Sequence, residues 1–143
     1  MADSRTIGLA RPVRGVKVYS RQMHGGCLPT FGRVELDFEP VPEGTEPSCE
    51  FACTARPEPN AELEEALVQG VMLELAGGPT DGPQARRSTA VSALVIVRSL
   101  TWHWVDSSER GFSRLGSLAV REALQCLAED REPQEITTRV SLL

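Results

Sequence analysis

The spacing of the hydrophobic residues changes twice along this chain, and this change restricts the possible folds more than any other feature. In the first 60 residues or so, Val34, Leu36 and Phe38 alternate with charged residues, which is typical of a strand with one buried and one solvent-exposed face. Similar short runs occupy residues 13–19 and 49–53. We therefore predict three antiparallel strands joined by turn-rich connections.

From residue 60 onward the hydrophobic spacing becomes helical. Asn60 is a favourable N-cap, glutamates follow it, and leucines and valines recur every fourth position. This pattern predicts a helix that runs to about Ala76, because the Gly-Gly-Pro at 77–79 stops it. A second helix is predicted over 112–127, after the quartet at 106–109, which fits a capping box.

Two further strands complete the predicted order of elements. The run from Val91 to Val97 is β-branched and nearly uninterrupted, which favours a buried central strand. A last alternating run over 136–142 predicts an edge strand. The order βββ-α-β-α-β predicts an α+β fold, a two-layer sandwich in which two helices cover one face of a mostly antiparallel sheet. The length fits one domain over 1–143.

The chain is acidic overall, but its charge is uneven. It holds 15 Lys and Arg against 20 Asp and Glu, with a formal net charge of −5 and a pI of about 5.1. This balance excludes a generic basic nucleic-acid binder. Residues 1–33 nevertheless hold six basic residues and one acidic residue, whereas residues 34–76 hold eleven acidic residues and one arginine. Such a basic end can still attract a nucleic-acid partner that lies within a Debye length, about 10 Å.

The single lysine, the short apolar runs and the spacing of the cysteines restrict the class of protein further. Lys17 is the only lysine, so a phosphate loop of the Gly-Lys-Ser/Thr type cannot occur and we expect no nucleotide bound by a P-loop. The longest apolar run, 93–97, is far short of the roughly 20 residues that cross a bilayer, so we expect no membrane partner and a cytoplasmic protein. The spacing of the cysteines predicts reduced, mostly buried thiols at Cys27, Cys49, Cys53 and Cys126.

Two segments carry a resemblance to a known family. Residues 92–124 have the sequence SALVIVRSLTWHWVDSSERGFSRLGSLAVREAL, and residues 24–40 have the sequence HGGCLPTFGRVELDFEP. Together they resemble the fourth domain (domain IV) of the translation elongation factor G family, with its patterns VxVTLYDGSYHxVDSSExAFxxAGSxAxxEA and SGGRGQYGHVxxxxEP. The resemblance covers roughly residues 20–128, and the string VDSSE after a histidine is its most specific part.

This resemblance implies a fold shared with the second domain of a small-subunit ribosomal protein, with a left-handed β-α-β crossover. In elongation factor G, two loops at the tip of this domain approach messenger and transfer RNA in the decoding site. His103 corresponds to the tip histidine, which carries diphthamide in eukaryotic and archaeal relatives, and Gly25, Gly26 and Phe31 fall on the other loop. At 28–30, Leu-Pro-Thr replaces the family's Arg-Gly-Gln and removes a phosphate-binding charge. The resemblance does not extend to a GTPase domain, so we expect a stand-alone, non-enzymatic domain.

The implied tip supports two functional hypotheses. In the first, the protein binds the ribosome or structured RNA, with tryptophans stacking on unpaired bases and arginines binding phosphates. The tip residues of this hypothesis are Gly25, Gly26, Phe31, Arg33, Arg98, Trp102, His103 and Trp104. In the second, the same fold is a protein-interaction module with no ribosomal role. Both hypotheses expect no catalytic residue and no cofactor.

Two other interpretations of the tip carry less weight. His24, Cys27 and His103 are metal-ligand types from the two tip loops, but no fourth ligand is evident, so we expect no metal site. His103 with the Asp-Ser-Ser at 106–108 has the residue types of a catalytic triad. Those three residues are better explained as a helix cap, and neither serine has a nucleophile elbow.

Overall fold

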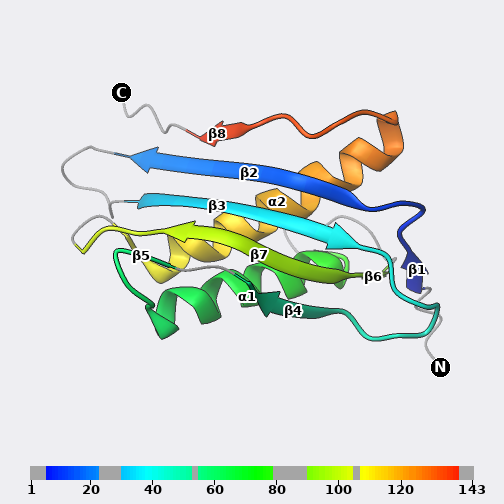
Figure 1. Ribbon diagram of the computed structural model, residues 1–143, viewed down its shortest axis with the longest axis horizontal. Helices are drawn as coiled ribbons and strands as arrows, with labels where there is room; N and C mark the ends of the chain where they lie inside the picture. The colour runs from blue at the N-terminus through cyan, green and yellow to red at the C-terminus, as the bar shows by residue number, and fades with distance from the viewer. Residues whose placement is uncertain (1–5, 23–29, 53–54, 79–89, 105–106, 139–143) are drawn as a thin grey trace.

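Two layers, one of strands and one of helices, make up the molecule (Figure 1). The computed structural model describes residues 6–22, 30–52, 55–78, 90–104 and 107–138. The main sheet contains β2 (Val13–Gln22), β3 (Thr30–Glu39), β4 (Ser48–Phe51), β5 (Ala55–Arg56), β7 (Leu94–Thr101) and β8 (Ile136–Thr138). The helices α1 (Ala61–Leu75) and α2 (Glu109–Glu129) lie behind this sheet in Figure 1. The predicted α+β sandwich, with helices on one face, is confirmed.

The main sheet is mixed. Its strands lie in the order β4-β7-β3-β2-β8, and β5 also pairs with β7. The two long ladders, β2 with β3 and β3 with β7, are antiparallel, whereas the short ladders at the edges are parallel. Because α1 passes behind the sheet between the parallel neighbours β4 and β7, this β-α-β connection is left-handed (Figure 1).

The position of β4 differs from the prediction. Its direction is opposite to that of β3, as an antiparallel set requires, but β7 lies between the two strands. The predicted pairing of three consecutive strands is therefore wrong for the third one. β7 is more apolar than β4, so its interior place in the sheet buries more hydrophobic surface than an interior place for β4 would.

The apolar run at 91–97 also differs from the prediction, because it is two strands and not one. It is divided at Ala93 into β6 (Ala90–Ser92) and β7. β6 leaves the main sheet and pairs in parallel with β1 (Thr6–Gly8), a strand that the hydrophobic pattern did not predict. The predicted edge strand is present as β8, and the residues beyond 138 lie outside the described part of the chain.

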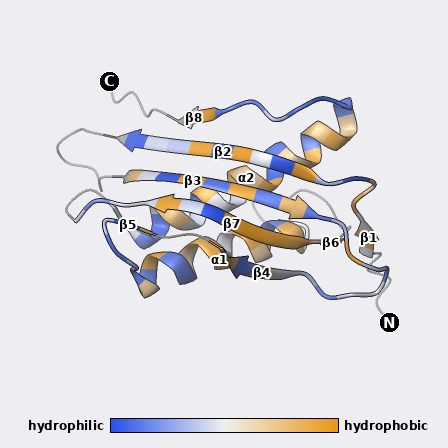
Figure 2. Cartoon of the chain, viewed as in Figure 1, coloured by the Kyte–Doolittle hydropathy of each residue, from blue (hydrophilic) through white to orange (hydrophobic). Residues whose placement is uncertain are grey.

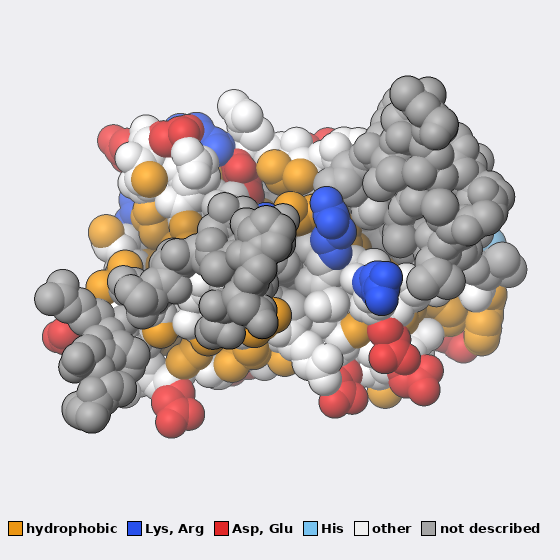
Figure 3. Space-filling model, turned by 180° about the vertical axis from the view of Figure 1, so that it is seen from behind, with side chains coloured by type: hydrophobic (Ala, Val, Ile, Leu, Met, Phe, Trp, Pro, Cys, Tyr) orange, Lys and Arg blue, Asp and Glu red, His pale blue; other side chains and the backbone are white. Residues whose placement is uncertain are grey.

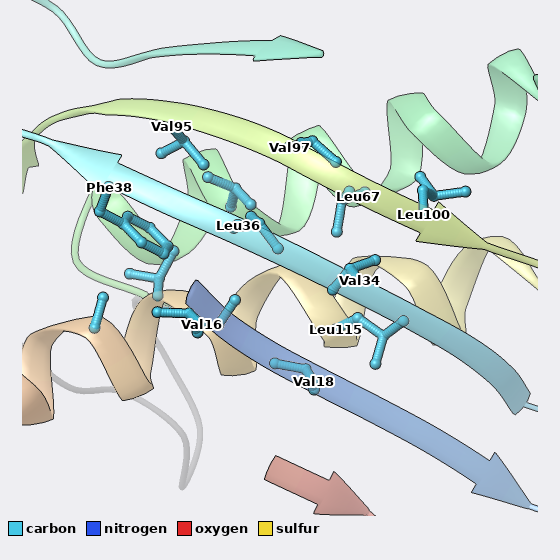
Figure 4. Close-up of a cluster of buried hydrophobic side chains, with 14 of the residues drawn as sticks. Val16, Val18, Val34, Leu36, Phe38, Leu67, Val95, Val97, Leu100 and Leu115 are labelled. Carbon is cyan, nitrogen blue, oxygen red and sulfur yellow. The ribbon is translucent and has the colours of Figure 1, made fainter. Parts of the chain in front are cut away.

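Alternation places the hydrophobic side chains of the sheet on the face that the helices cover. Figure 2 shows this as orange bands on the strands, with the first half of β7 almost continuously orange. In the close-up of Figure 4, side chains from three strands lie over the two helices. The labelled core residues are all almost fully buried: Val16, Val18, Val34, Leu36, Phe38, Leu67, Val95, Val97, Leu100 and Leu115. None of the described helices covers the opposite face of the sheet, which we call the helix-free face.

Glycines let the two helices approach closely. A Cβ atom on Gly70 of α1 would lie 1.9 Å from the carbonyl oxygen of Ser113, and one on Gly116 of α2 would lie 2.5 Å from that of Leu67. Beside this crossing the buried Glu74 accepts a hydrogen bond of 2.6 Å from the hydroxyl of Ser117. The two helices therefore pack with their backbones in direct contact at this crossing.

Candidate functional site

The tip histidine lies in a turn that is tied to the start of β3. The backbone N–H of His103 donates to Oγ of Ser107 at 2.8 Å, and the N–H of Ser107 donates to the carbonyl of His103 at 3.1 Å. Oγ of Ser107 in turn donates to the carbonyl of Phe31 at 2.8 Å. These bonds bring Phe31 and His103 together at one end of the sheet. Gly25 and Gly26 lie outside the described residues.

The start of α2 corrects the predicted capping box. Ser108 is the N-cap, and its Oγ accepts a hydrogen bond of 3.1 Å from the N–H of Gly111. A capping box needs Glu or Gln three residues after the capping serine, and that position is Gly111. Ser108 alone therefore caps the helix, and Ser107 holds the tip turn. Asp106 lies outside the described residues.

The two tryptophans of the tip have different environments. Trp102 is only 5% exposed, and its indole N–H donates to the carbonyl of Glu58 at 2.6 Å. Trp104 is 70% exposed, and its ring meets that of Trp102 edge to face with 4.8 Å between centroids. Of these two, only Trp104 offers a ring face to a ligand, and Trp102 supports it from the core.

A row of rings leads from the tip onto the helix-free face of the sheet. Phe31 and His103 meet edge to face at 6.3 Å between centroids, and Tyr19 and Phe31 do so at 5.9 Å. The guanidinium of Arg33 lies 5.8 Å from the centroid of the Tyr19 ring. Arg33 also forms an ion pair of 3.7 Å with Glu135. Tyr19 was not among the predicted site residues, although its alternation with Val16 and Val18 placed it on this face.

Arg98 has a structural partner within the sheet. It occupies a bulge of β7, where the register with β3 shifts, and its Nε donates to Oδ2 of Asp37 at 2.8 Å. The other oxygen of Asp37 accepts a hydrogen bond of 2.8 Å from the N–H of Gly15, which has a φ of 77° in a bulge of β2. Asp37 therefore joins two bulges, and Arg98 neutralises this buried carboxylate.

Two hollows flank the tip on opposite sides. A hollow of about 250 Å³ lies between the N-termini of α1 and α2, and its lining includes Trp104, His103 and the carboxylates of Glu62 and Glu109. A hollow of about 340 Å³ lies on the helix-free face, and its side chains are mostly polar. It is lined by Lys17, Arg33, Val34, Glu35, Arg56, Ser99, Leu100 and Thr101. The sequence did not indicate Arg56 as a site residue, because a strand as short as β5 has no periodic signal.

The described residues form no cluster of metal ligands, and burial affects both of the cysteines among them. No group of three or more His, Cys, Asp or Glu among them is placed to hold a metal ion, and both His24 and Cys27 lie outside this part of the chain. Burial raises the pKa of the thiols of Cys49 and Cys126 to about 11, so neither is an activated nucleophile. Neither described helix combines the length and apolar character that crossing a bilayer requires.

The comparisons with known proteins address the fold. No family model matches the sequence. A crystal structure of an elongation factor G-like protein from Thermus thermophilus matches with a TM-score of 0.59 and 22% identity. The fold is similar to domain IV of elongation factor G. The match covers 90% of this chain and 17% of the Thermus chain, and at this identity it shows the fold alone.

Proposed function

We propose that this protein binds the ribosome or another structured RNA through its tip and catalyses no reaction. The observation that carries the proposal is the exposed ring of Trp104, which stands beside His103 on the rigid support of the buried Trp102. Stacking of an unpaired base on such a ring contributes about 1–3 kcal/mol. The fold similarity to an elongation factor G-like protein supports a role related to translation.

A protein partner is the second candidate, and the charge beside Trp104 favours it. The hollow between the helix N-termini is lined by Glu62 and Glu109, and their carboxylates repel a phosphate at that position. A protein that presents an apolar side chain to Trp104 and a basic side chain to these glutamates fits the same hollow.

Co-sedimentation with ribosomes from the protein's own host tests the first candidate. The wild type is compared at two salt concentrations with the His103→Ala/Trp104→Ala double variant. Leu73→Ala is the control, because Leu73 is an exposed apolar residue in the last turn of α1, at the end of the helix away from the residues that line the tip hollow. We expect the wild type and the control to pellet with ribosomes and the double variant to remain in the supernatant. Failure of the wild type to pellet at low salt would exclude ribosome binding and favour the protein partner.

A further inference from the structure

The hollow on the helix-free face gathers side chains from four strands. In the strand register, Lys17 of β2 lies opposite Glu35 of β3. Two positions along β3, Arg33 lies opposite Thr101 of β7, and Thr101 lies opposite Arg56 of β5. Neighbouring strands are about 4.8 Å apart, so the backbones of Arg33 and Arg56 are about 10 Å apart on either side of Thr101. This row of residues crosses the sheet next to the tip.

The charge of this hollow is opposite to that of the whole chain. Lys17, Arg33 and Arg56 line it against the single carboxylate of Glu35, although the chain has a net charge of −5. Within the described part of the chain, no carboxylate forms an ion pair with Lys17 or Arg56. The pair of Arg33 with Glu135 is long, and both of its side chains are about half exposed, so an incoming anion can replace it.

The chemistry of the lining matches a phosphate group. Arginine and lysine donate charged hydrogen bonds to phosphate oxygens, and the hydroxyl groups of Ser99 and Thr101 on the floor add neutral donors. The carboxylates of Glu62 and Glu109 exclude a phosphate from the hollow on the other side of the tip. For a phosphate near Trp104, the charges therefore favour the helix-free face over the hollow between the helix N-termini.

We infer that the hollow lined by Lys17, Arg33 and Arg56 binds the phosphates of a single-stranded RNA segment. This inference rests on the proposed function and adds the backbone contacts to it. The open face of a sheet accommodates an extended strand, and the ring contacts from His103 through Phe31 to Tyr19 supply aromatic edges from the tip onto this face. A duplex keeps its bases paired and leaves these rings and Trp104 unused.

Fluorescence anisotropy with a labelled single-stranded RNA of mixed sequence, about a dozen nucleotides long, tests the inference. The test variant is Lys17→Ala/Arg56→Ala. The matched control is Arg110→Ala/Arg114→Ala, which removes the same charge from exposed positions of α2 on the helix face, the face seen in Figure 3. We expect the test variant to bind at least about tenfold more weakly, and the slope of log K against log salt to fall by about 1.4, since each lost phosphate contact removes about 0.7. The control should change affinity less than about twofold, and thermal unfolding checks that both variants fold.

Three outcomes would overturn the inference. The first is an equal loss of affinity in the control, which would mean diffuse attraction to the whole molecule. The second is equal affinity for a duplex of the same sequence. The third is competition by poly-glutamate that is as strong as competition by unlabelled RNA.

The ribosome experiment separates this inference from the proposed function. If the Lys17→Ala/Arg56→Ala variant keeps its RNA affinity while the His103→Ala/Trp104→Ala variant loses ribosome binding, the inference fails and the tip proposal stands. If the first variant loses RNA affinity while the tip variant still pellets with ribosomes, the hollow is the RNA site and the tip proposal fails.

Discussion

Trp102 and Trp104 contribute differently to the stability of this molecule. Trp102 fills the end of the core, and its indole N–H is bonded to Glu58, whereas Trp104 projects into solvent. We predict that Trp102→Ala lowers the free energy of unfolding by about 3–5 kcal/mol. Trp104→Ala should lower it by about 1 kcal/mol or less, because only the edge contact with Trp102 is lost. Urea denaturation measures both, and equal losses would contradict the different burial of the two rings.

The carboxylate of Glu122 makes the end of α2 sensitive to acid. It is buried, and it accepts hydrogen bonds of 2.7 and 3.2 Å from Arg131 and one of 2.9 Å from the N–H of Gln134. Burial alone raises the pKa of Glu122, but the bonds from Arg131 and Gln134 outweigh burial, and the pKa lies below its ordinary value of 4.5. The chain after the helix is therefore held by an ionised glutamate.

The lowered pKa of Glu122 predicts how stability depends on pH. Because the pKa is lower in the folded state than in the unfolded state, this contribution is fully present above about pH 4.5 and is lost as the pH falls through the folded value. Glu122→Gln should cost about 1–3 kcal/mol at neutral pH and flatten the loss of stability below about pH 4.5. Urea denaturation at a series of pH values tests this, with the exposed Glu132→Gln as control. A variant with the wild-type slope would show that Glu122 is not the responsible group.

At the scale of elements, the contact between α1 and α2 depends on glycine. Alanine at Gly116 would gain about 1 kcal/mol of helix propensity. Its Cβ, however, would lie 2.5 Å from the carbonyl oxygen of Leu67 and 2.9 Å from the N of Val71, both backbone atoms that cannot rotate away. We predict that Gly116→Ala lowers the free energy of unfolding by about 1–3 kcal/mol.

Gly8→Ala is the control for this effect of packing. A Cβ at Gly8 would meet only the carbonyl oxygen of Val41, at an ordinary contact distance of 3.8 Å. Its stability should change by less than about 0.5 kcal/mol, and chemical denaturation compares the two variants. If Gly116→Ala stabilises the protein instead, the helices can separate without loss of packing.

The elements that the sequence predicted correctly carry their own periodic signal. Both helices and the strands β2 and β3 have long amphipathic patterns, and Asn60 caps α1 as expected. The apolar pattern of β7 was also visible, but nothing in it marked the break from β6 at Ala93. β1 and β5 have three and two residues, which is too short for a period to be seen. Local patterns also could not predict which strand lies beside β4. That strand is β7, which follows α1 in the chain.

The candidate site was partly visible in the sequence for similar reasons. Leu100 and Trp102 are apolar residues two positions apart, and this alternation continues the core-facing side of β7. Alternation could not predict the side on which Arg98 lies, because the bulge at its position shifts the register of the strand. Alternation placed Lys17 on the open face, whereas the pairing of β5 with β7 brought Arg56 to it from a distant segment.

At the scale of the whole molecule, folding rearranges the charge that the sequence shows in blocks. The basic block at 1–33 supplies Lys17 and Arg33 to the helix-free face, and Arg56 joins them from the acidic block at 34–76. Glutamates of the two helix N-termini gather on the other side of the tip. An acidic protein thus presents a basic surface on its helix-free face, and a local RNA contact needs such a surface.

Stability should also be graded across the molecule, from the middle of the sheet to its edges. β3 is bonded on both sides, by β2 and β7, and its core-facing side chains are almost fully buried under the helices. β8 is an edge strand of three residues, and β1 pairs with β6 outside the main sheet. Since amides exchange by local opening where few contacts must break, we predict that the amides of Val34 and Leu36 exchange at least about a hundredfold more slowly than that of Thr137. Hydrogen exchange followed by NMR measures this ratio, and equal protection of β8 and β3 would mean that the sheet opens only as a unit.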